Sequence, residues 1–420
     1  MKTKIFIPLV IFTVFLSSCI KDKSTKTYTI YRPEFSVKQS IKDNAFLQSP
    51  SIMKNLGSFA LYNNMMFINE KNKGIHVIDC SQPSNPVNKG FIPIPGNTGL
   101  AIKNDALYAD CYCDLLVFSI SSKENISCVN ALPNIFKTRV TKTPVDTTIV
   151  KVTWITKDTT IEARYYNYAL MNSLDKRNSV QYATTSTSNG TGAGNNVNPG
   201  GSGATSVGSS LSVFTIINDF LYTVDETSLR TFLIGAGNYP ELKNTVKVGS
   251  NIETIYSFKN KLFIGSMNGM YMYSLNNPAS PNYISQYNHI RVCDPVIADD
   301  NYAFVTLRSG TRCNGFTNQL DILDIQDVEQ PELIRSISYT SPTGLSKEGN
   351  VLFLCDGNAG LKVLDVTDVS AITTRQSYSI GNALDVIALD QKAYVMLETG
   401  IKIYSFDQQF NVNFLGGLNK

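Results

Sequence analysis

A short strand-like segment recurs seven times along this chain. Each copy alternates apolar with variable residues, and five of the six intervals between copies span 40 to 50 residues. The copies begin at Ile75, Leu115, Leu229, Met270, Leu320, Leu361 and Ile401, and the one longer interval, 114 residues, follows the second copy. A period near 40 residues, filled with short strands and turns, is typical of β-propeller blades. The chain is therefore predicted to be all-β, with almost no helix.

The sixth copy shows how one repeat would form four strands. The strands are predicted at residues 343–347, 351–355, 361–366 and 373–378, with a tight turn at Gly349-Asn350 between the first two. Two of the intervals are longer than the regular repeat. When their extra residues are subtracted from residues 55–418, about 40 residues remain for each of seven blades. One such sheet cannot bury both of its faces alone, so the seven sheets are expected to stack around an axis.

The sequence leaves two ways to close this ring. The last blade takes its outer strand either from residues 412–418 alone or with an addition from residues 28–31.

Residues 1–18 have the features of an export signal. Lys2 and Lys4 precede an apolar run of about a dozen residues, which is too short to span a bilayer but right for a signal h-region. Leu16-Ser17-Ser18-Cys19 resembles the bacterial lipobox, which implies cleavage before Cys19 and lipidation of that cysteine. The alternative is an ordinary signal peptide with a chance cysteine. Residues 19–54 are then predicted to be a polar, lipid-anchored tether.

The composition limits the class of partner. The formal net charge of +3 falls to about +1 once Lys2 and Lys4 are removed with the signal. The chain therefore has no basic field for nucleic acid, and no cofactor is predicted. The expected partners are the membrane, through the N-terminal lipid, and an unidentified protein or glycan. The protein is expected to be a monomer.

Several strings resemble the LVIVD-repeat lipoproteins of Bacteroidetes, over about residues 55–406 outside the long interval. They include Gly74-Ile75-His76-Val77-Ile78-Asp79, Cys293-Asp294-Pro295-Val296 and Cys355-Asp356-Gly357-Asn358-Ala359-Gly360. The repeat is named for an apolar strand that ends in Val-Asp, and Asp79, Asp324 and Asp365 occupy the Asp position. The resemblance implies a propeller outside the cytoplasm and no particular chemistry. Lys21-Asp22, just after Cys19, resembles the export signal of surface lipoproteins in the same phylum, which implies the cell surface rather than the inner face of the outer membrane.

The long interval predicts an insertion at residues 125–208. Residues 148–156 and 160–168 are rich in Val, Ile, Thr and Tyr, and predict a β-hairpin around Lys157-Asp158. Residues 183–210 are almost entirely Ser, Thr, Gly and Asn, and are predicted to be flexible. Thr147 and Thr159 lie in Asp-Thr-Thr strings that resemble the O-glycosylation acceptor of Bacteroidetes, although so short a motif also occurs by chance.

The cysteines predict one disulfide. The connections that carry Cys293 and Cys313 open on the same face of a propeller, so a bond between them is sterically plausible. The alternative is two half-buried thiols. Cys111 and Cys113 are interpreted as structural rather than metal-binding, because the chain has no second close cysteine pair.

Carboxylates provide the candidate ligand site. Glu253, Asp294 and Asp385 each fall at the start of a predicted inner strand, and these starts converge near the axis on one face. Together with Arg308 and Asp356 they could bind a cation or a polar ligand. The alternative is that these positions are merely solvated and carry charge freely.

Two functional hypotheses follow. The favoured one is a non-enzymatic outer-membrane or cell-surface lipoprotein whose propeller binds a protein or glycan. The alternative is a metal-dependent lactonase-like or glycan-processing propeller enzyme that uses Glu253, Asp294 and Asp385. Only two histidines and one tryptophan are present, which disfavours His-dependent hydrolysis and propellers that stack ligands on tryptophan. A structural envelope protein is a third possibility.

Overall fold

The computed structural model describes residues 25–136, 149–162, 204–288, 295–309 and 317–419. The chain divides into two compact units: residues 1–34 with 153–188, and residues 35–152 with 189–420. The larger unit contains the repeats. Along the described part of the chain, no helix has both the length and the apolar character that a bilayer crossing requires.

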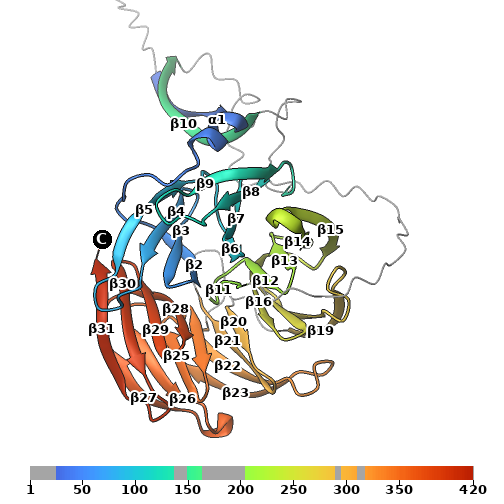
Figure 1. The fold of residues 1–420 in the computed structure, drawn as a ribbon, viewed down its shortest axis with the longest axis vertical. Helices are drawn as coiled ribbons and strands as arrows, with labels where there is room; N and C mark the ends of the chain where they lie inside the picture. Colours follow the sequence, from blue (N-terminus) through green and yellow to red (C-terminus); the bar gives the residue numbers. More distant parts are fainter. Residues whose placement is uncertain (1–24, 137–148, 163–203, 289–294, 310–316, 420) are drawn as a thin grey trace, which may run out of the picture. The chain divides into compact units, whose positions relative to one another are not determined.

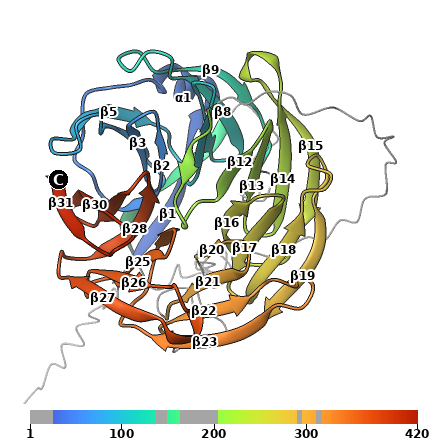
Figure 2. The same cartoon turned by 60° about the horizontal axis from the view of Figure 1, so that its bottom comes forward.

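The larger unit is a seven-bladed propeller, as predicted, and its four-stranded antiparallel sheets form a ring (Figure 2). Blades one to three are β2 (Leu56–Tyr62), β3 (Met65–Glu70), β4 (Gly74–Asp79) and β5 (Val87–Pro93); β6 (Leu100–Lys103), β7 (Ala106–Cys111), β8 (Asp114–Ser119) and β9 (Ser127–Leu132); and β12 (Phe214–Ile217), β13 (Phe220–Val224), β14 (Ser228–Ile234) and β15 (Pro240–Lys247). Blades four and five are β16 (Ile252–Phe258), β17 (Lys261–Ser266), β18 (Gly269–Ser274) and β19 (Asn282–Asn288); and β20 (Val296–Ala298), β21 (Tyr302–Leu307), β22 (Gln319–Asp324) and β23 (Glu332–Ser338). Blades six and seven are β24 (Leu345–Glu348), β25 (Val351–Cys355), β26 (Leu361–Asp365) and β27 (Thr373–Tyr378); and β28 (Ala383–Leu389), β29 (Lys392–Leu397), β30 (Gly400–Phe406) and β31 (Val412–Asn419). Two 3₁₀ turns, η3 (Ala236–Asn238) and η4 (Val369–Ala371), lie between third and fourth strands.

The turns between first and second strands follow from residues that tolerate positive φ. Asn63 and Asn64 have φ of 47° and 60°, and Asn104 and Asp105 have 49° and 58°. Two consecutive positive φ angles define the type I′ hairpin turn, whose twist matches the flanking strands. Asp390 and Gln391 repeat this pattern in blade seven, so in these three blades a polar pair ends the first strand and starts the second. Blades three, four and six have a single positive φ there, at Asn218, Lys259 and Gly349.

The core lies between blades rather than within them. Seven clusters of buried apolar residues join each blade to its neighbour, including one between blades seven and one. Both faces of the middle strands are buried, so a strand such as β25 is apolar at every position. Packing of successive blades is therefore what stabilises the ring.

A β-bulge recurs in every blade. The register between the third and fourth strands shifts by one residue at the same place in all seven, for example between Val77 and Ile78 and between Val363 and Leu364. A bulge bends the strand that carries it and increases its twist. Each outer strand therefore bends at the same point along the rim.

The ring closes without an exchanged strand. Blade seven takes all four strands from the C-terminal residues, and β31 is its outermost strand. Residues 28–31 lie instead in β1 (Thr25–Val37), which pairs with β10 (Ile149–Glu162) in a separate two-stranded sheet (Figure 1). Of the two closures that the sequence allowed, the structure has the first.

The predicted tether is partly wrong, because its second half is ordered on the propeller. Residues 38–44 form the helix α1 (Lys38–Asn44), and its buried Ile41 joins the cluster between blades one and two. Beyond the helix, Leu47 N donates to Ile126 O and Gln48 N donates to Phe91 O, each at 2.8 Å. A few apolar side chains, among them Ile41, Ala45 and Leu47, anchor this polar stretch, together with side-chain and backbone hydrogen bonds that no composition reveals.

The predicted insertion differs in two ways. Its first residues, 127–132, are β9, the outer strand of blade two. The predicted hairpin around Lys157-Asp158 is instead the single 14-residue strand β10, which pairs with β1. Side-chain hydrogen bonds link the two strands, from Thr29 Oγ1 to Asp158 Oδ1 at 2.7 Å and between the hydroxyls of Thr27 and Thr160 at 2.9 Å. Lys157-Asp158 lacks the Gly or Asn that a tight turn favours, so the strand continues.

Candidate functional site: the axial channel and the insertion face

Residues 204–213, here called the axial segment, lie along the inner strands of the ring. Asn104 N donates to Ala204 O at 3.1 Å, and Ser206 N donates to Ile102 O at 2.8 Å, both in blade two. The two-residue strand β11 (Val207–Gly208) pairs with β2 as a fifth strand of blade one. The prediction that residues 183–210 are flexible is therefore wrong for 204–210. Their hydrogen bonds to inner-strand edges replace the apolar burial that the segment lacks.

The tip of the segment reaches three further blades. Ser210 Oγ donates to Asp385 Oδ1 of blade seven at 3.0 Å, and it accepts from Leu345 N of blade six at 2.9 Å. Ile255 N of blade four donates to Ser212 O at 2.8 Å. Five of the seven inner strands therefore contact one short piece of chain, and the protein itself occupies its own axis at this level.

The axial segment enters the ring from the face opposite to the one where the insertion leaves. Phe136, the last residue of the described range 25–136, donates its N–H to Cys113 O at 2.9 Å, at the turn between β7 and β8. Ala204 lies at the Asn104 turn between β6 and β7, at the other end of the same blade. The face that carries Cys113 and Phe136 is called the insertion face below. The chain thus leaves at the insertion face and returns through the channel from the opposite face.

Asp385 is the predicted ligand residue that the structure describes most fully. Its carboxyl is completely buried at the start of β28, as the sequence placed it. Val386 N donates to Oδ1 at 2.9 Å, and Leu211 N lies 3.4 Å from Oδ2. Burial raises the pKa of Asp385 to about 7, although hydrogen bonds from Ser209, Val386, Ser210 and Leu211 act to lower it. The donors around this carboxyl are thus the protein's own groups.

The structure describes three of the other predicted ligand residues. Glu253 is half-buried at the start of β16, and Arg308 is half-buried just after β21. Asp356 is buried and accepts from Thr340 N at 2.9 Å and from Ser341 N at 2.7 Å, which shapes the connection between blades five and six. Asp294 lies outside the described residues, so the five-residue axial site stays a prediction.

The described residues contain no cluster of three His, Cys, Asp or Glu side chains that could hold a metal ion. Five cysteines within the same ranges are free thiols: Cys80, Cys111, Cys113, Cys128 and Cys355. Cys293 and Cys313 lie outside those ranges, and their disulfide stays a prediction. The same holds for lipidation at Cys19 and glycosylation at Thr147, while Thr159 is half-buried within β10.

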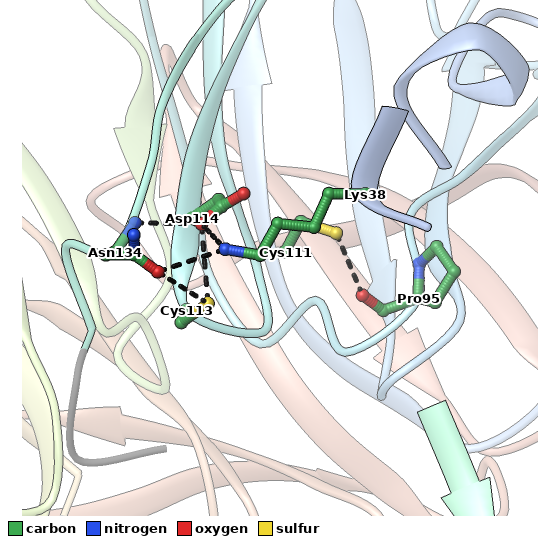
Figure 3. A network of polar contacts seen from close by, with 6 residues as sticks. All are labelled: Lys38, Pro95, Cys111, Cys113, Asp114 and Asn134. Carbon is green, nitrogen blue, oxygen red and sulfur yellow. Dashed lines mark hydrogen bonds and ion pairs between the residues drawn. The ribbon is translucent and has the colours of Figure 1, made fainter. Parts of the chain in front are cut away.

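A polar network on the insertion face fixes the start of α1 (Figure 3). Lys38 Nζ donates to Asp114 Oδ1 at 2.8 Å and to Asn134 Oδ1 at 3.0 Å, and Asn134 N donates to the same Asp114 oxygen at 2.8 Å. Burial lowers the pKa of Lys38, but its contacts with Asp114 and Cys113 outweigh burial and raise it. Lys38 is therefore a partly buried cation, with its side chain 12% exposed, that joins the N-terminal segment to blade two.

The two cysteines of this network are unsuited to nucleophilic chemistry. Cys111 Sγ donates to Pro95 O at 3.3 Å, and Cys113 Sγ donates to Asp114 Oδ1 at the same distance. Burial raises the pKa of both thiols, so little thiolate forms near neutral pH. The cysteines flank Tyr112, which has φ of 53°: Cys111 ends β7, and Cys113 lies in the turn before β8.

The Asp that ends the third strand has a structural role. Asp79, Asp324 and Asp365 each accept the N–H of the residue two positions on, at 2.8–2.9 Å. Such Asx-turns start the connection to the fourth strand. In blade four the Ser at this position makes the weaker equivalent, where Asn276 N donates to Ser274 Oγ at 3.2 Å. The hydrogen bonds from Ser81 hold the pKa of Asp79 below its usual range.

Comparison with known proteins agrees with this geometry. The model of the LVIVD repeat matches residues 57–92 and 344–379, which correspond to blades one and six. The chain is thus a propeller that contains LVIVD repeats. No curated protein matches it.

Solved structures are similar at the level of the fold. A crystal structure of a protein from Lactobacillus plantarum has 13% identity and a TM-score of 0.54, over 86% of this chain and 96% of that one. The computationally designed Ika8 protein has 10% identity and a TM-score of 0.49, over 86% and 87%. BamB from Moraxella catarrhalis has 8% identity and a TM-score of 0.48, over 91% and 99%. At such identities the first of these supports the fold alone.

Sequence reasoning missed the residues that organise the axis and the N-terminal docking. Ser209 and Ser210 lie in a low-complexity stretch, and Lys38 lies in a stretch interpreted as a tether. The available signal was the return of apolar residues at Leu211, Val213 and Phe214, which marks where an ordered strand begins. It does not show what the preceding serines contact.

Proposed function

We propose that this protein is a lipid-anchored lipoprotein of the outer membrane, displayed at the cell surface, whose propeller is a non-enzymatic scaffold for a protein or glycan. The anchor rests on the Leu16-Ser17-Ser18-Cys19 string that follows an apolar signal segment. The Bacteroidetes family resemblance supports the same location. The LVIVD repeats supply a rigid ring, and function on such a common fold has to come from a particular site.

The observation that carries the scaffold role is the occupied axis. The inner strands of blades one, two, four, six and seven bind residues 204–213 of the same chain, and Asp385 is enclosed by that segment. A substrate would have to displace this segment to reach Asp385. We therefore place partner binding on the insertion face, where the N-terminal segment docks and the insertion leaves the ring.

Membrane anchoring is tested with a Cys19→Ala variant in the native host. The wild-type protein is expected in the membrane fraction and to be degraded when protease is added to intact cells, whereas the variant is expected in the soluble fraction. Wild-type protein that resists protease on intact cells but is degraded after lysis would contradict surface display and leave the anchor intact. Soluble wild-type protein would contradict both.

Partner binding is tested by photocrosslinking in intact cells. A benzoyl-phenylalanine placed at Tyr112 keeps an aromatic ring on the insertion face, beside Gly96. The matched control is the same replacement at Tyr239, which is half exposed and follows η3, whose Asn238 contacts the Asn104 turn on the opposite face. A discrete protein or glycan adduct at Tyr112 and none at Tyr239 is expected. Adducts at Tyr239 alone would move the binding surface to the other face.

The insertion should not be tested by deleting residues 125–208. That deletion removes β9 and half of the axial segment, so loss of binding would only reflect damage to blade two and the axis.

A further inference from the structure

The carboxyl of Asp385 is fully buried, yet its described neighbours are neutral hydrogen-bond donors and include no cation. Hydroxyl and backbone N–H donors from Ser209, Ser210, Leu211 and Val386 surround it. Within the described residues no ion pair reaches it. The titratable group that interacts with it is the Cys355 thiol of blade six, which the Asp356 carboxylate also affects, and neither group is a cation. The charge of an ionised Asp385 is therefore not neutralised by any described group.

Apart from Val386 N of its own strand, the donors to this carboxyl all belong to the axial segment. Ser210 bridges Asp385 Oδ1 and Leu345 N, and Ser209 Oγ accepts from Phe59 N at 3.2 Å. A Cβ added to Gly344 would lie 1.9 Å from Asp385 Oδ1, so backbone fills the remaining side. When the segment is seated, water cannot reach the acid. When the segment leaves the channel, the acid becomes solvated.

We propose that Asp385 and Ser210 form a proton-controlled latch, which holds the returning end of the insertion in the axial channel when the carboxyl is protonated and loosens when it ionises. The proposal concerns a conformational equilibrium of the fold and does not rest on the proposed function.

The direction of the pH effect follows from linkage. Burial raises the pKa of the seated carboxyl to about 7 from the ordinary aspartate value of 3.8, so the seated state binds the proton more tightly than the open state. This contribution to seating is complete below about pH 4 and is lost as the pH rises through about 7. Acid therefore closes the latch and alkali loosens it.

Hydrogen exchange of the full chain tests the latch. The reporters are the amides of Ile255 and Leu345, which donate to Ser212 O and Ser210 Oγ of the axial segment. Their protection factors, corrected for intrinsic exchange, are expected to fall on the order of 100-fold between pH 5 and pH 8. The amide of Leu352, the second residue of β25, which pairs with β24 and β26, is the internal control and is expected to change less than threefold.

The matched variant is Asp385→Asn, which cannot ionise and keeps an acceptor for Ser210. Its Ile255 and Leu345 protection is expected to be independent of pH. Equal wild-type protection at both pH values, an equal loss at Leu352, or an unchanged fall in Asp385→Asn would each overturn the latch. If Asp385→Asn does not fold, Ser210→Ala serves instead. In that variant the amides of Ile255 and Leu345 are expected to be less protected at pH 5, while the protection of Leu352 stays as in the wild type. Unchanged protection in Ser210→Ala would also overturn the proposal.

Discussion

The blades and the axial segment are ordered in different ways. A blade is held by apolar side chains that recur every 40 residues or so and pack against the next blade, as in the cluster that joins blades six and seven. The axial segment has almost no buried apolar surface, and it is held by backbone and serine hydrogen bonds to five inner strands. Periodic apolar residues order a region because they are buried. Small polar residues order a region only where backbone groups without other partners are available for hydrogen bonding.

The N-terminal segment lies between these two cases. Ile41 and Ala45 are buried in the cluster between blades one and two, and Lys38 adds a buried ion pair. A few apolar contacts and one charge are enough to dock a segment that looks like a linker. Four substitutions separate these contributions, three measured by global unfolding and one by local proteolysis.

Phe353→Ala should have the largest effect. Phe353 is fully buried in β25 and packs edge-on against Phe406, with ring centroids 4.9 Å apart. Removing such a side chain leaves a cavity and costs about 3–5 kcal/mol. Denaturant unfolding measures the loss, with the half-exposed rim residue Leu333→Ala as control, expected to change stability by less than about 0.5 kcal/mol. Equal losses in both variants would contradict a core between blades.

Lys38→Met should have the next largest effect, because it leaves Asp114 buried without its cation. The Lys38 and Asp114 side chains are 12% and 5% exposed. Breaking a pair with this burial is expected to cost roughly 2–4 kcal/mol, locally at α1. Faster proteolysis near α1 at unchanged ring stability is the expected result. Lys73→Met, on an exposed residue of the same face, is the control. Simultaneous loss of the whole ring would show that docking and ring are one cooperative unit.

Ser210→Ala tests the axial hydrogen bonds. It removes a donor to Asp385 and an acceptor for Leu345 N, both buried, and is expected to cost roughly 1–3 kcal/mol. The exposed Ser84→Ala is the control. A Ser210→Ala protein as stable as wild type would mean that the axial segment contributes little to closing the ring.

Asp324→Ala should have the smallest effect. It removes one Asx-turn hydrogen bond, to Gln326 N at 2.8 Å, at an exposed connection. A cost of about 0.5–1 kcal/mol is expected, with Ser274→Ala in blade four costing less. Thermal unfolding of the two variants side by side measures the difference. A larger loss for Ser274→Ala would contradict the role given to the repeat's Asp.

How much of the site was predictable depends on the kind of residue. Asp385 and Glu253 were placed correctly at the starts of inner strands, because strand starts follow from the apolar repeat. What faces Asp385 was not predictable, because Ser210 lies 175 residues away in the chain. Lys157-Asp158 was interpreted as a turn because the partner of β10, at residues 25–37, is more than 100 residues distant. Local sequence patterns predict individual strands, whereas contacts between distant segments are seen only in the three-dimensional structure.

The sequence by itself determined the ring: the period, the number of blades, the four strands of each and the turn residues between them. These follow from burial and from local backbone preferences, which act within about 40 residues. Only the tertiary structure decided that the axis is occupied, that residues 38–48 dock on blades one and two, and that β10 pairs with β1. Those outcomes depend on backbone groups and small polar side chains whose partners lie far away in the chain, and hydrogen bonding of that kind leaves no periodic mark in a sequence.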